Sequence, residues 1–105
     1  MSESIFQKQF IRKLRRMFPG CEVLKNDSGY RQGIPDWTLF WGPYWAMLEI
    51  KASENARTQP NQPYYVKKLN EMSFAAFVYP ENEEEVLAAL QNAFASRGSA
   101  LVSQS

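Results

Sequence analysis

The sequence contains no histidine and only one cysteine, Cys21, among its 105 residues. The absence of histidine excludes Ser-His-Asp and Cys-His catalysis and metal sites built on imidazole. A lone cysteine excludes an internal disulfide and a cysteine zinc site, which is typical of a reducing compartment. No apolar run approaches the ~20 residues of a membrane span, and the N-terminus lacks a basic-then-apolar signal pattern. We therefore expect a cytoplasmic protein with no membrane partner.

The composition is that of a globular protein whose charges are unevenly placed. Apolar residues make up 45% of the chain, and a chain of this length can form one domain with its own core. The net charge is only +1, but basic and acidic residues gather in different parts of the sequence. This asymmetry favours a polyanion on one face, although the polar face of any amphipathic helix also accounts for part of it. The basic set is Lys8, Arg12, Lys13, Arg15, Arg16, Lys25 and Arg31, and the acidic set is Glu81, Glu83, Glu84 and Glu85.

Hydrophobic spacing and turn residues predict the order of helices and strands. We expect a helix over residues 4–18, strands over 21–26, 36–41 and 44–52, a helix over 62–72, a strand over 74–79 and a helix over 83–94 closed by residues 97–99. The strand over 74–79 follows a crossover helix and should pair in parallel. This order, αβββαβα, predicts an α/β fold with a mixed central sheet in a single domain over 1–97, with a flexible tail over 98–105. The expected core residues of the three helices are Phe6, Phe10 and Leu14, then Tyr65, Leu69 and Met72, then Val86, Leu87, Leu90 and Phe94.

The middle of the chain reads as a β-hairpin that brings two carboxylates together. Gly42-Pro43 is the strong turn signal between Asp36 and Glu49, and a loop centred there places these two residues opposite each other. Strand alternation then puts Lys51 on the same face as Glu49. Opposed side chains have Cβ atoms about 4.5 to 5.5 Å apart, so two like charges would destabilise the sheet unless something neutralises them.

A divalent cation is the natural neutralising group for Asp36 and Glu49. Mg²⁺ is commonly held by one or two carboxylates together with water and phosphate oxygens. An ammonium on the same face, Lys51, can hold a water or offset charge developing on a phosphate. The alternative is an ordinary solvated hairpin with a Glu49/Lys51 pair on its exposed face.

These residues resemble the motifs of the PD-(D/E)XK nuclease superfamily. Gly33-Ile34-Pro35-Asp36 followed by Glu49-Ile50-Lys51 is similar to the small VRR-NUC type, in which a polar segment and a glutamine opening a helix come next. The matching glutamine here is Gln62, although the residues before Pro60 are only similar to the family pattern. The resemblance covers residues from about 4 to 90 and implies a restriction-endonuclease-like core.

The resemblance implies a Mg²⁺-dependent DNA endonuclease that hydrolyses phosphodiester bonds, with Mn²⁺ able to substitute and no organic cofactor. It implies that Asp36, Glu49 and the carbonyl of Ile50 hold the metal, that Lys51 acts on the water or the phosphate, and that Gln62 contacts the nucleophile region or the scissile phosphate. In relatives an acidic residue of the first helix often joins the metal. Glu3 is the candidate here, and a glutamate favoured by the helix dipole is the alternative.

Small stand-alone domains of this type are often phage enzymes of DNA repair and recombination that act on Holliday junctions or other branched DNA as homodimers. We accordingly expect DNA as the partner, a bacterial or phage-infected cell as the setting, and a homodimer joined through an apolar patch of Trp41, Tyr44 and Trp45 at the hairpin tip. Burial of these aromatics under the last helix is the alternative. A non-catalytic DNA-binding module on the same fold is the rival function. The residues expected to contact DNA are Lys8, Arg12, Lys25, Tyr30, Arg31 and Arg57, with simple packing as the alternative for Tyr30 and Arg31.

Overall fold

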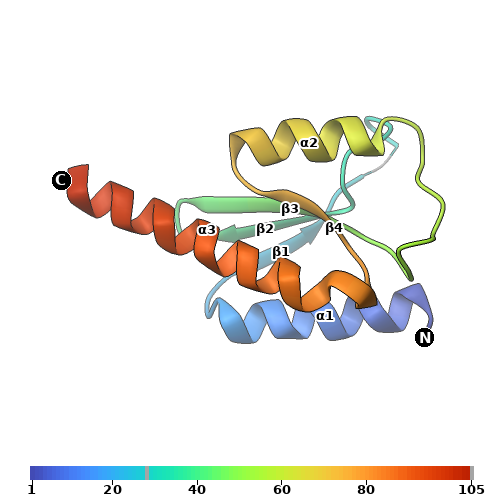
Figure 1. Cartoon of the computed structure of the whole chain (residues 1–105), viewed down its shortest axis with the longest axis horizontal. Coiled ribbons are helices and arrows are strands. Elements are labelled where there is room, and N and C mark those ends of the chain that lie inside the picture. Colours follow the sequence, from blue (N-terminus) through green and yellow to red (C-terminus); the bar gives the residue numbers. More distant parts are fainter. Residues whose placement is uncertain (28, 105) are drawn as a thin grey trace.

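The fold is a four-stranded sheet with helices on both faces (Figure 1). The computed structural model describes residues 1–27 and 29–104, and describes side chains as far as residue 96. The elements are α1 (Glu3–Met17), β1 (Glu22–Lys25), β2 (Trp37–Trp41), β3 (Tyr44–Ile50), α2 (Gln62–Met72), β4 (Ala75–Val78), a short 3-10 turn (Pro80–Asn82) and α3 (Glu83–Gln104). The predicted α/β order with a mixed sheet is confirmed.

The sheet has the strand order β1-β2-β3-β4. Its first two pairings are antiparallel and the β3–β4 pairing is parallel, as the crossover through α2 predicts. The β2–β3 register places Trp37 opposite Leu48 and Trp41 opposite Tyr44. Gly42 adopts φ +60, and the ring of Pro43 holds the next φ negative. This combination is that of a type II′ turn, whose twist fits the two strands of a hairpin. The predicted register is therefore confirmed.

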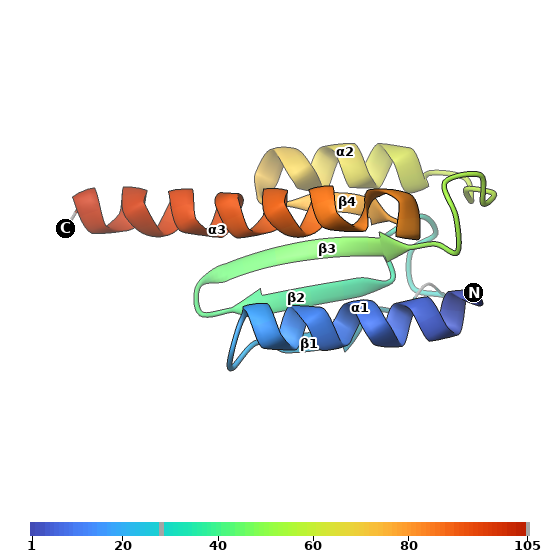
Figure 2. The ribbon, with the colours of Figure 1, turned by 60° about the horizontal axis from the view of Figure 1, so that its bottom comes forward.

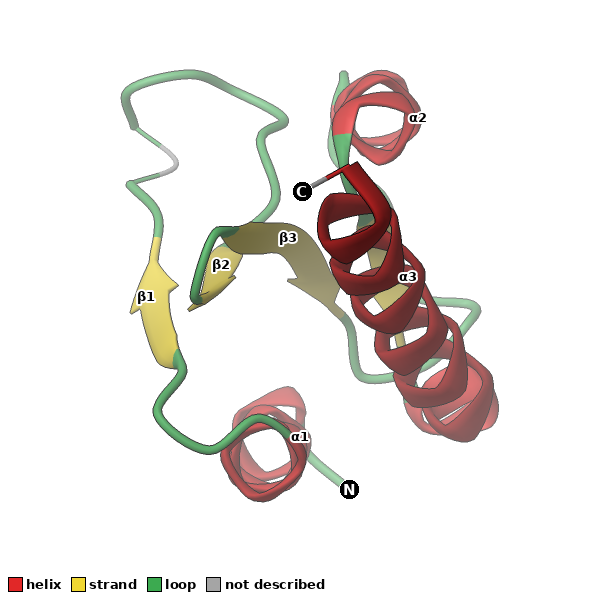
Figure 3. Cartoon of the chain, turned by 90° about the vertical axis from the view of Figure 1, so that its left-hand side faces the viewer, coloured by secondary structure: helices red, strands yellow, loops and turns green. Residues whose placement is uncertain are grey.

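The core lies between the sheet and the pair α1 and α3, whereas α2 covers the opposite face only over β3 and β4 (Figures 2 and 3). In α1, Ser2 caps the first turn by accepting a hydrogen bond from the amide of Ile5 at 3.1 Å. Every fourth residue of α1 then points to the sheet, so its apolar stripe is fully buried. The largest core side chains are Phe6, Phe10, Leu14, Phe18, Leu39, Leu48, Ile50, Leu90 and Phe94.

Two predictions about the helices are wrong. The inner stripe expected for α2 does not join the core: Tyr65 and Leu69 are only half-buried, and Met72, the last residue before the chain turns into β4, stays 60% exposed. The helix α3 does not end at residues 97–99 but continues to Gln104, since a single Gly98 without a following proline costs a helix only about 1 kcal/mol. The domain limit at residue 97 stays a prediction, and Ser105 lies outside the described residues. None of the described helices is both long and apolar enough to cross a membrane.

Candidate active site

Asn26 fixes the strand end that carries Asp36, through both its backbone and its side chain. Its backbone amide donates to the carbonyl of Asp36 at 2.6 Å, and its side-chain amide donates to the carbonyl of Pro35 at 2.8 Å. The hydroxyl of Thr38 donates to the same side chain at 2.9 Å. Asn26 therefore binds the chain before and after Asp36, and it holds this carboxylate where the register places it, opposite Glu49.

Glu49 is a buried carboxylate with an unsatisfied oxygen. Only 2% of the residue is exposed, and its Oε1 has no hydrogen-bond partner among residues 1–27 and 29–104. Burial, and after it the charge of the Asp36 carboxylate, raises the pKa of the Glu49 carboxyl from 4.5 to about 7, while Lys51 opposes the rise. A buried acceptor without a donor costs free energy, so this oxygen is suited to a cation that is bound there.

Lys51 lies beside Glu49 and is also buried, although the hairpin alternative puts it in solvent. Its Nζ is 3.8 Å from Oε2 of Glu49 and donates to the carbonyl of Arg57 at 3.3 Å. Only 9% of Lys51 is exposed. The alternative of an ordinary solvated hairpin is therefore wrong for both residues, because neither is exposed to solvent. A buried charge needs a partner, and Glu49 and Lys51 lie close enough to partner each other.

Pro35 cannot donate a backbone hydrogen bond to the Ile50 carbonyl. The carbonyl of Asp36 points to β1, as its bond with Asn26 shows, so the next residue along β2 bonds to β3. Continuing this register two residues beyond Trp37 and Leu48 places Pro35 opposite Ile50. Proline has no N–H, so it cannot donate to that carbonyl. The role of the Ile50 carbonyl as a metal ligand is consistent with this pairing and stays a prediction.

A close backbone contact brings α2 to the strand end. Gly33 has φ +96, and a Cβ added there would lie 2.6 Å from the Cβ of Asn61 and 2.8 Å from its carbonyl carbon. Only glycine fits this position. Asn61 itself has φ +71, and the next residue, Gln62, opens α2. The contact therefore positions the first residue of α2 against the loop that leads to Asp36.

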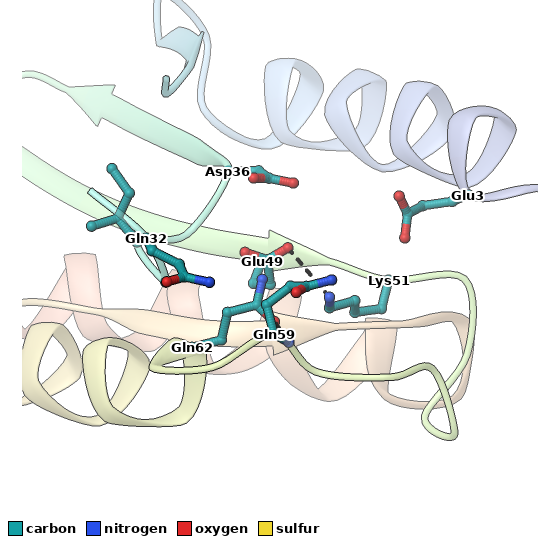
Figure 4. Close-up of a pocket in the computed structure, with 9 residues that line it drawn as sticks. Glu3, Gln32, Asp36, Glu49, Lys51, Gln59 and Gln62 are labelled. Atoms are coloured by element: carbon teal, nitrogen blue, oxygen red, sulfur yellow. Dashed lines mark hydrogen bonds and ion pairs between the residues drawn. The ribbon is translucent and has the colours of Figure 1, made fainter. Parts of the chain in front are cut away.

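The orientation of the Gln62 amide is set by a backbone donor. The amide of Gln59 donates to Oε1 of Gln62 at 2.7 Å, so the side-chain nitrogen of Gln62 remains as a donor. Gln62 is 6% exposed and lines the same cleft as Asp36 and Glu49 (Figure 4). The structure thus brings the predicted glutamine to the two carboxylates and presents it as a hydrogen-bond donor.

These side chains line a cleft of about 390 Å³ between the first turns of α1 and α2 (Figure 4). Glu3 projects into it from α1, as the metal-ligand prediction requires. Within the described ranges, however, no three Cys, Asp or Glu side chains are grouped closely enough to hold one metal ion, so Glu3 does not complete a three-carboxylate set. Its role as a ligand stays a prediction. The full lining is Glu3, Gln32, Gly33, Ile34, Asp36, Glu49, Lys51, Gln59 and Gln62.

Two residues of this cleft, Gln32 and Gln59, were not predicted as site residues. Gln32 directly precedes the Gly33-Ile34-Pro35-Asp36 motif, and Gln59 lies three residues before Gln62 in the sequence. Their positions beside the motifs are the signal that identifies them. Together with Gln62 they give the cleft uncharged donors and acceptors in addition to its charges.

The residues predicted to contact DNA fall into three places. Tyr30 is 81% exposed, so the packing alternative is wrong for it, and Arg31 beside it is also exposed. Lys8 and Arg12 lie on the outer flank of α1, while Lys25 stands over the ring of Trp37. Arg57 is exposed in the loop before α2, where its carbonyl holds Lys51. Contact with DNA stays a prediction for all six.

The aromatic residues of the hairpin tip pack against α3. The rings of Trp41 and Tyr44 stack on Phe94 with centroids 6.1 and 5.5 Å apart. The indole of Trp41 also donates to the carbonyl of Pro19 at 3.0 Å. Burial under the last helix is therefore the correct alternative for these two side chains, and they form no free dimer patch.

The fold is similar to that of a solved VRR_NUC domain. The two structures superpose with a TM-score of 0.62 at 16% sequence identity, over 84% of this chain and 97% of the other. No family model matches the sequence, and no curated protein matches it. The chain therefore has the fold of a VRR_NUC domain, and the motif residues Asp36, Glu49, Lys51 and Gln62 meet in one cleft of that fold.

Proposed function

We propose that this protein is a metal-dependent DNA endonuclease that hydrolyses phosphodiester bonds in the cleft between α1 and α2. The observation that carries the proposal is the buried Glu49, whose Oε1 lacks a partner within the described part of the chain while Lys51 lies 3.8 Å from Oε2. Such an arrangement is costly for stability alone, and sites of this kind are typically functional. The similarity of the fold to a VRR_NUC domain supports this class of chemistry.

The residues present fit a divalent cation with oxygen ligands. Asp36 and Glu49 supply two carboxylates, and Ile50 supplies a carbonyl that Pro35 cannot satisfy. Mg²⁺ prefers this hard donor set, and Mn²⁺ accepts it. When bound, the ion would offset negative charge on the phosphate and make water a better nucleophile.

The remaining roles belong to side chains of the chain itself. Lys51, held by the Arg57 carbonyl, directs an ammonium at the position where a water or phosphate oxygen would lie. Gln62 offers its fixed amide N–H groups to a phosphate oxygen or to the attacking water. Water adds to phosphorus and gives up a proton, the bond from phosphorus to one ester oxygen breaks, and that oxygen takes up a proton from solvent, so the products are a phosphate monoester and a hydroxyl.

We propose branched DNA, such as a Holliday junction, as the preferred substrate. Tyr30 supports this choice because it is 81% exposed in the loop that also carries Gln32 and Gly33 into the cleft. An exposed aromatic ring can stack on a base only where that base is free of its neighbours, as at a branch point.

The deciding experiment compares cleavage of supercoiled plasmid, linear duplex, flap and four-way junction DNA in Mg²⁺, Mn²⁺ and EDTA. We expect cleavage with either metal, none in EDTA, and the fastest rate on branched DNA. Asp36→Asn is the matched control, since it keeps the shape of the side chain and removes its charge. DNA binding without cleavage under every metal condition would instead identify a non-catalytic DNA-binding module.

We also propose a homodimer, joined through the face of β1 and β2 that no described helix covers (Figure 3). Leu24 and Phe40 lie diagonally on this face and are 50% and 44% exposed. Sedimentation equilibrium at high micromolar concentration should show a dimer, and Phe40→Asp should shift it to monomer. A wild-type protein that remains monomeric at that concentration would contradict the dimer.

A further inference from the structure

A second cleft, of about 280 Å³, lies between α1 and the start of β2 and is strongly basic. Its lining is Lys8, Ile11, Arg12, Arg15 and Trp37, with no acidic residue. The three cations are spaced four and three residues apart, so they form one ridge along a flank of α1. This flank is separate from the core stripe of the same helix.

The charges of this cleft are not compensated by the protein. Among the described side chains, residues 1–27 and 29–96, the ion pairs are Lys13 with Glu83 at 2.7 Å and Lys51 with Glu49, so the three cations of the cleft have no acidic partner there. Lys25 adds a fourth positive charge, with its Nζ 5.5 Å from the centroid of the Trp37 ring. Like charges gathered around one cleft favour an anionic ligand.

The indole nitrogen of Trp37 is a second, independent indication that this cleft binds a ligand. Its Nε1 is buried and has no hydrogen-bond acceptor within the described residues, although the ring lines the cleft. A buried donor without an acceptor is unusual in a folded protein. Trp37 directly follows Asp36 in the chain, so one strand end contributes a side chain to each cleft, on opposite faces of the sheet.

The helix α1 connects the two clefts with a spacing that fits nucleic acid. Glu3 lines the first cleft, and Lys8 and Arg15 line the second. At 1.5 Å per residue, these two cations lie about 8 and 18 Å from Glu3 along the helix axis. One DNA strand carries a phosphate for about every 3.4 Å of duplex axis, so the ridge spans about three phosphates.

We propose that this second cleft binds the sugar-phosphate backbone of the DNA substrate about two to five nucleotides to one side of the scissile phosphate. The inference rests on the proposed function for the identity of the nucleic acid and for the position of the scissile phosphate. The cleft would fix the direction in which the DNA leaves the active site, because phosphate contacts set register and orientation.

The test measures DNA affinity by fluorescence anisotropy as a function of salt concentration, in EDTA, with the full chain carrying Asp36→Asn. Arg12→Ala and Arg15→Ala should each weaken binding and reduce the slope of log K against log salt by about 0.9. Arg16→Ala is the matched control, since it removes the same charge from an exposed position of the same helix that does not line the cleft. All three positions are exposed, so unchanged melting temperatures should show that the variants fold.

Two further arms define the ligand and the geometry. In the first arm, duplexes are shortened stepwise on either side of the cleavage position. When fewer than about five nucleotides remain on one side, Arg15→Ala and Arg16→Ala should bind the duplex with equal affinity. The cleft variants are also tested with thymidine 5′-phosphate. If they weaken its binding as much as they weaken the binding of DNA, the cleft is a pocket for a single phosphate, and the backbone assignment is overturned.

The result separates this inference from the proposed function. Equal salt slopes for Arg12→Ala, Arg15→Ala and Arg16→Ala would overturn the second cleft as a DNA site, even if the wild-type protein cleaves DNA. Failure of the wild type to cleave DNA would overturn the nuclease proposal, while the salt slopes would still report on the second cleft.

Discussion

Replacing Lys51 with methionine should reduce the cleavage rate at saturating Mg²⁺ by at least about 10²–10³-fold, the cost of removing one preorganised charge-stabilising donor. Lys51 is buried, and its Nζ reaches both Oε2 of Glu49 and the carbonyl of Arg57. Methionine fills nearly the same space without the charge, so the effect measures the ammonium rather than a cavity. Alanine would add the cost of a cavity to the same measurement.

The control for this variant concerns metal affinity. Lys51 lowers the pKa of Glu49, so its removal makes that carboxyl harder to ionise and weakens any cation bound there. Rates must therefore be compared at saturating metal, with single-turnover kinetics and a metal titration for each protein. A Lys51→Met variant that cleaves at the wild-type rate once metal is saturating would exclude Lys51 from the chemical step.

The local rules of the hairpin made the central part of the site predictable. Gly42 and Pro43 dictate the turn, the turn dictates the register, and the register places Asp36 opposite Glu49. Strand alternation then adds Lys51 to the same face. The bounds of α2 were also predictable, because Pro63 suits the first turn of a helix. Each of these inferences involves residues within about fifteen positions of each other.

Features that depend on distant packing were not predictable. The sequence alone does not show that Gly33 must accommodate Asn61, because this contact joins two loops separated by β2 and β3. The burial of Lys51 likewise results from the loop after β3 folding back over it. In the second cleft, Lys8 and Arg12 were predicted to contact DNA. Arg15 and Trp37 could be added only once the structure showed which flank of α1 lies over β2.

Replacing Glu49 with glutamine should stabilise the metal-free protein at pH 8 by about 3 kcal/mol, which corresponds to a rise in melting temperature on the order of 10 °C or more. The cause is the pKa of the Glu49 carboxyl, which burial and Asp36 raise from 4.5 to about 7. Ionising this group in the folded protein costs free energy that ionising it in the unfolded chain does not. Glutamine keeps the size of the side chain and removes the charge.

The sign of the pH dependence follows from proton binding. Between about pH 4.5 and 7 the folded protein holds a proton on Glu49 that the unfolded chain has lost, so stability falls as pH rises through this range. The contribution is fully present below pH 4.5 and is lost above pH 7. Wild type should therefore lose stability between pH 5 and pH 8 relative to Glu49→Gln, and the two proteins should melt at similar temperatures at pH 5.

Metal should remove most of this difference in stability at pH 8. A ligand that binds only the folded state adds about 2.7 kcal/mol at a hundred times its Kd, so Mg²⁺ or Mn²⁺ should raise the melting temperature of the wild type. The metal should scarcely affect Glu49→Gln, which lacks the buried carboxylate, or Asp36→Asn, which lacks its partner. Calorimetry of the three proteins at pH 5 and pH 8, with and without metal, measures all of these differences. Parallel pH profiles for wild type and Glu49→Gln, together with equal responses to metal, would show that the two carboxylates do not form a cation site.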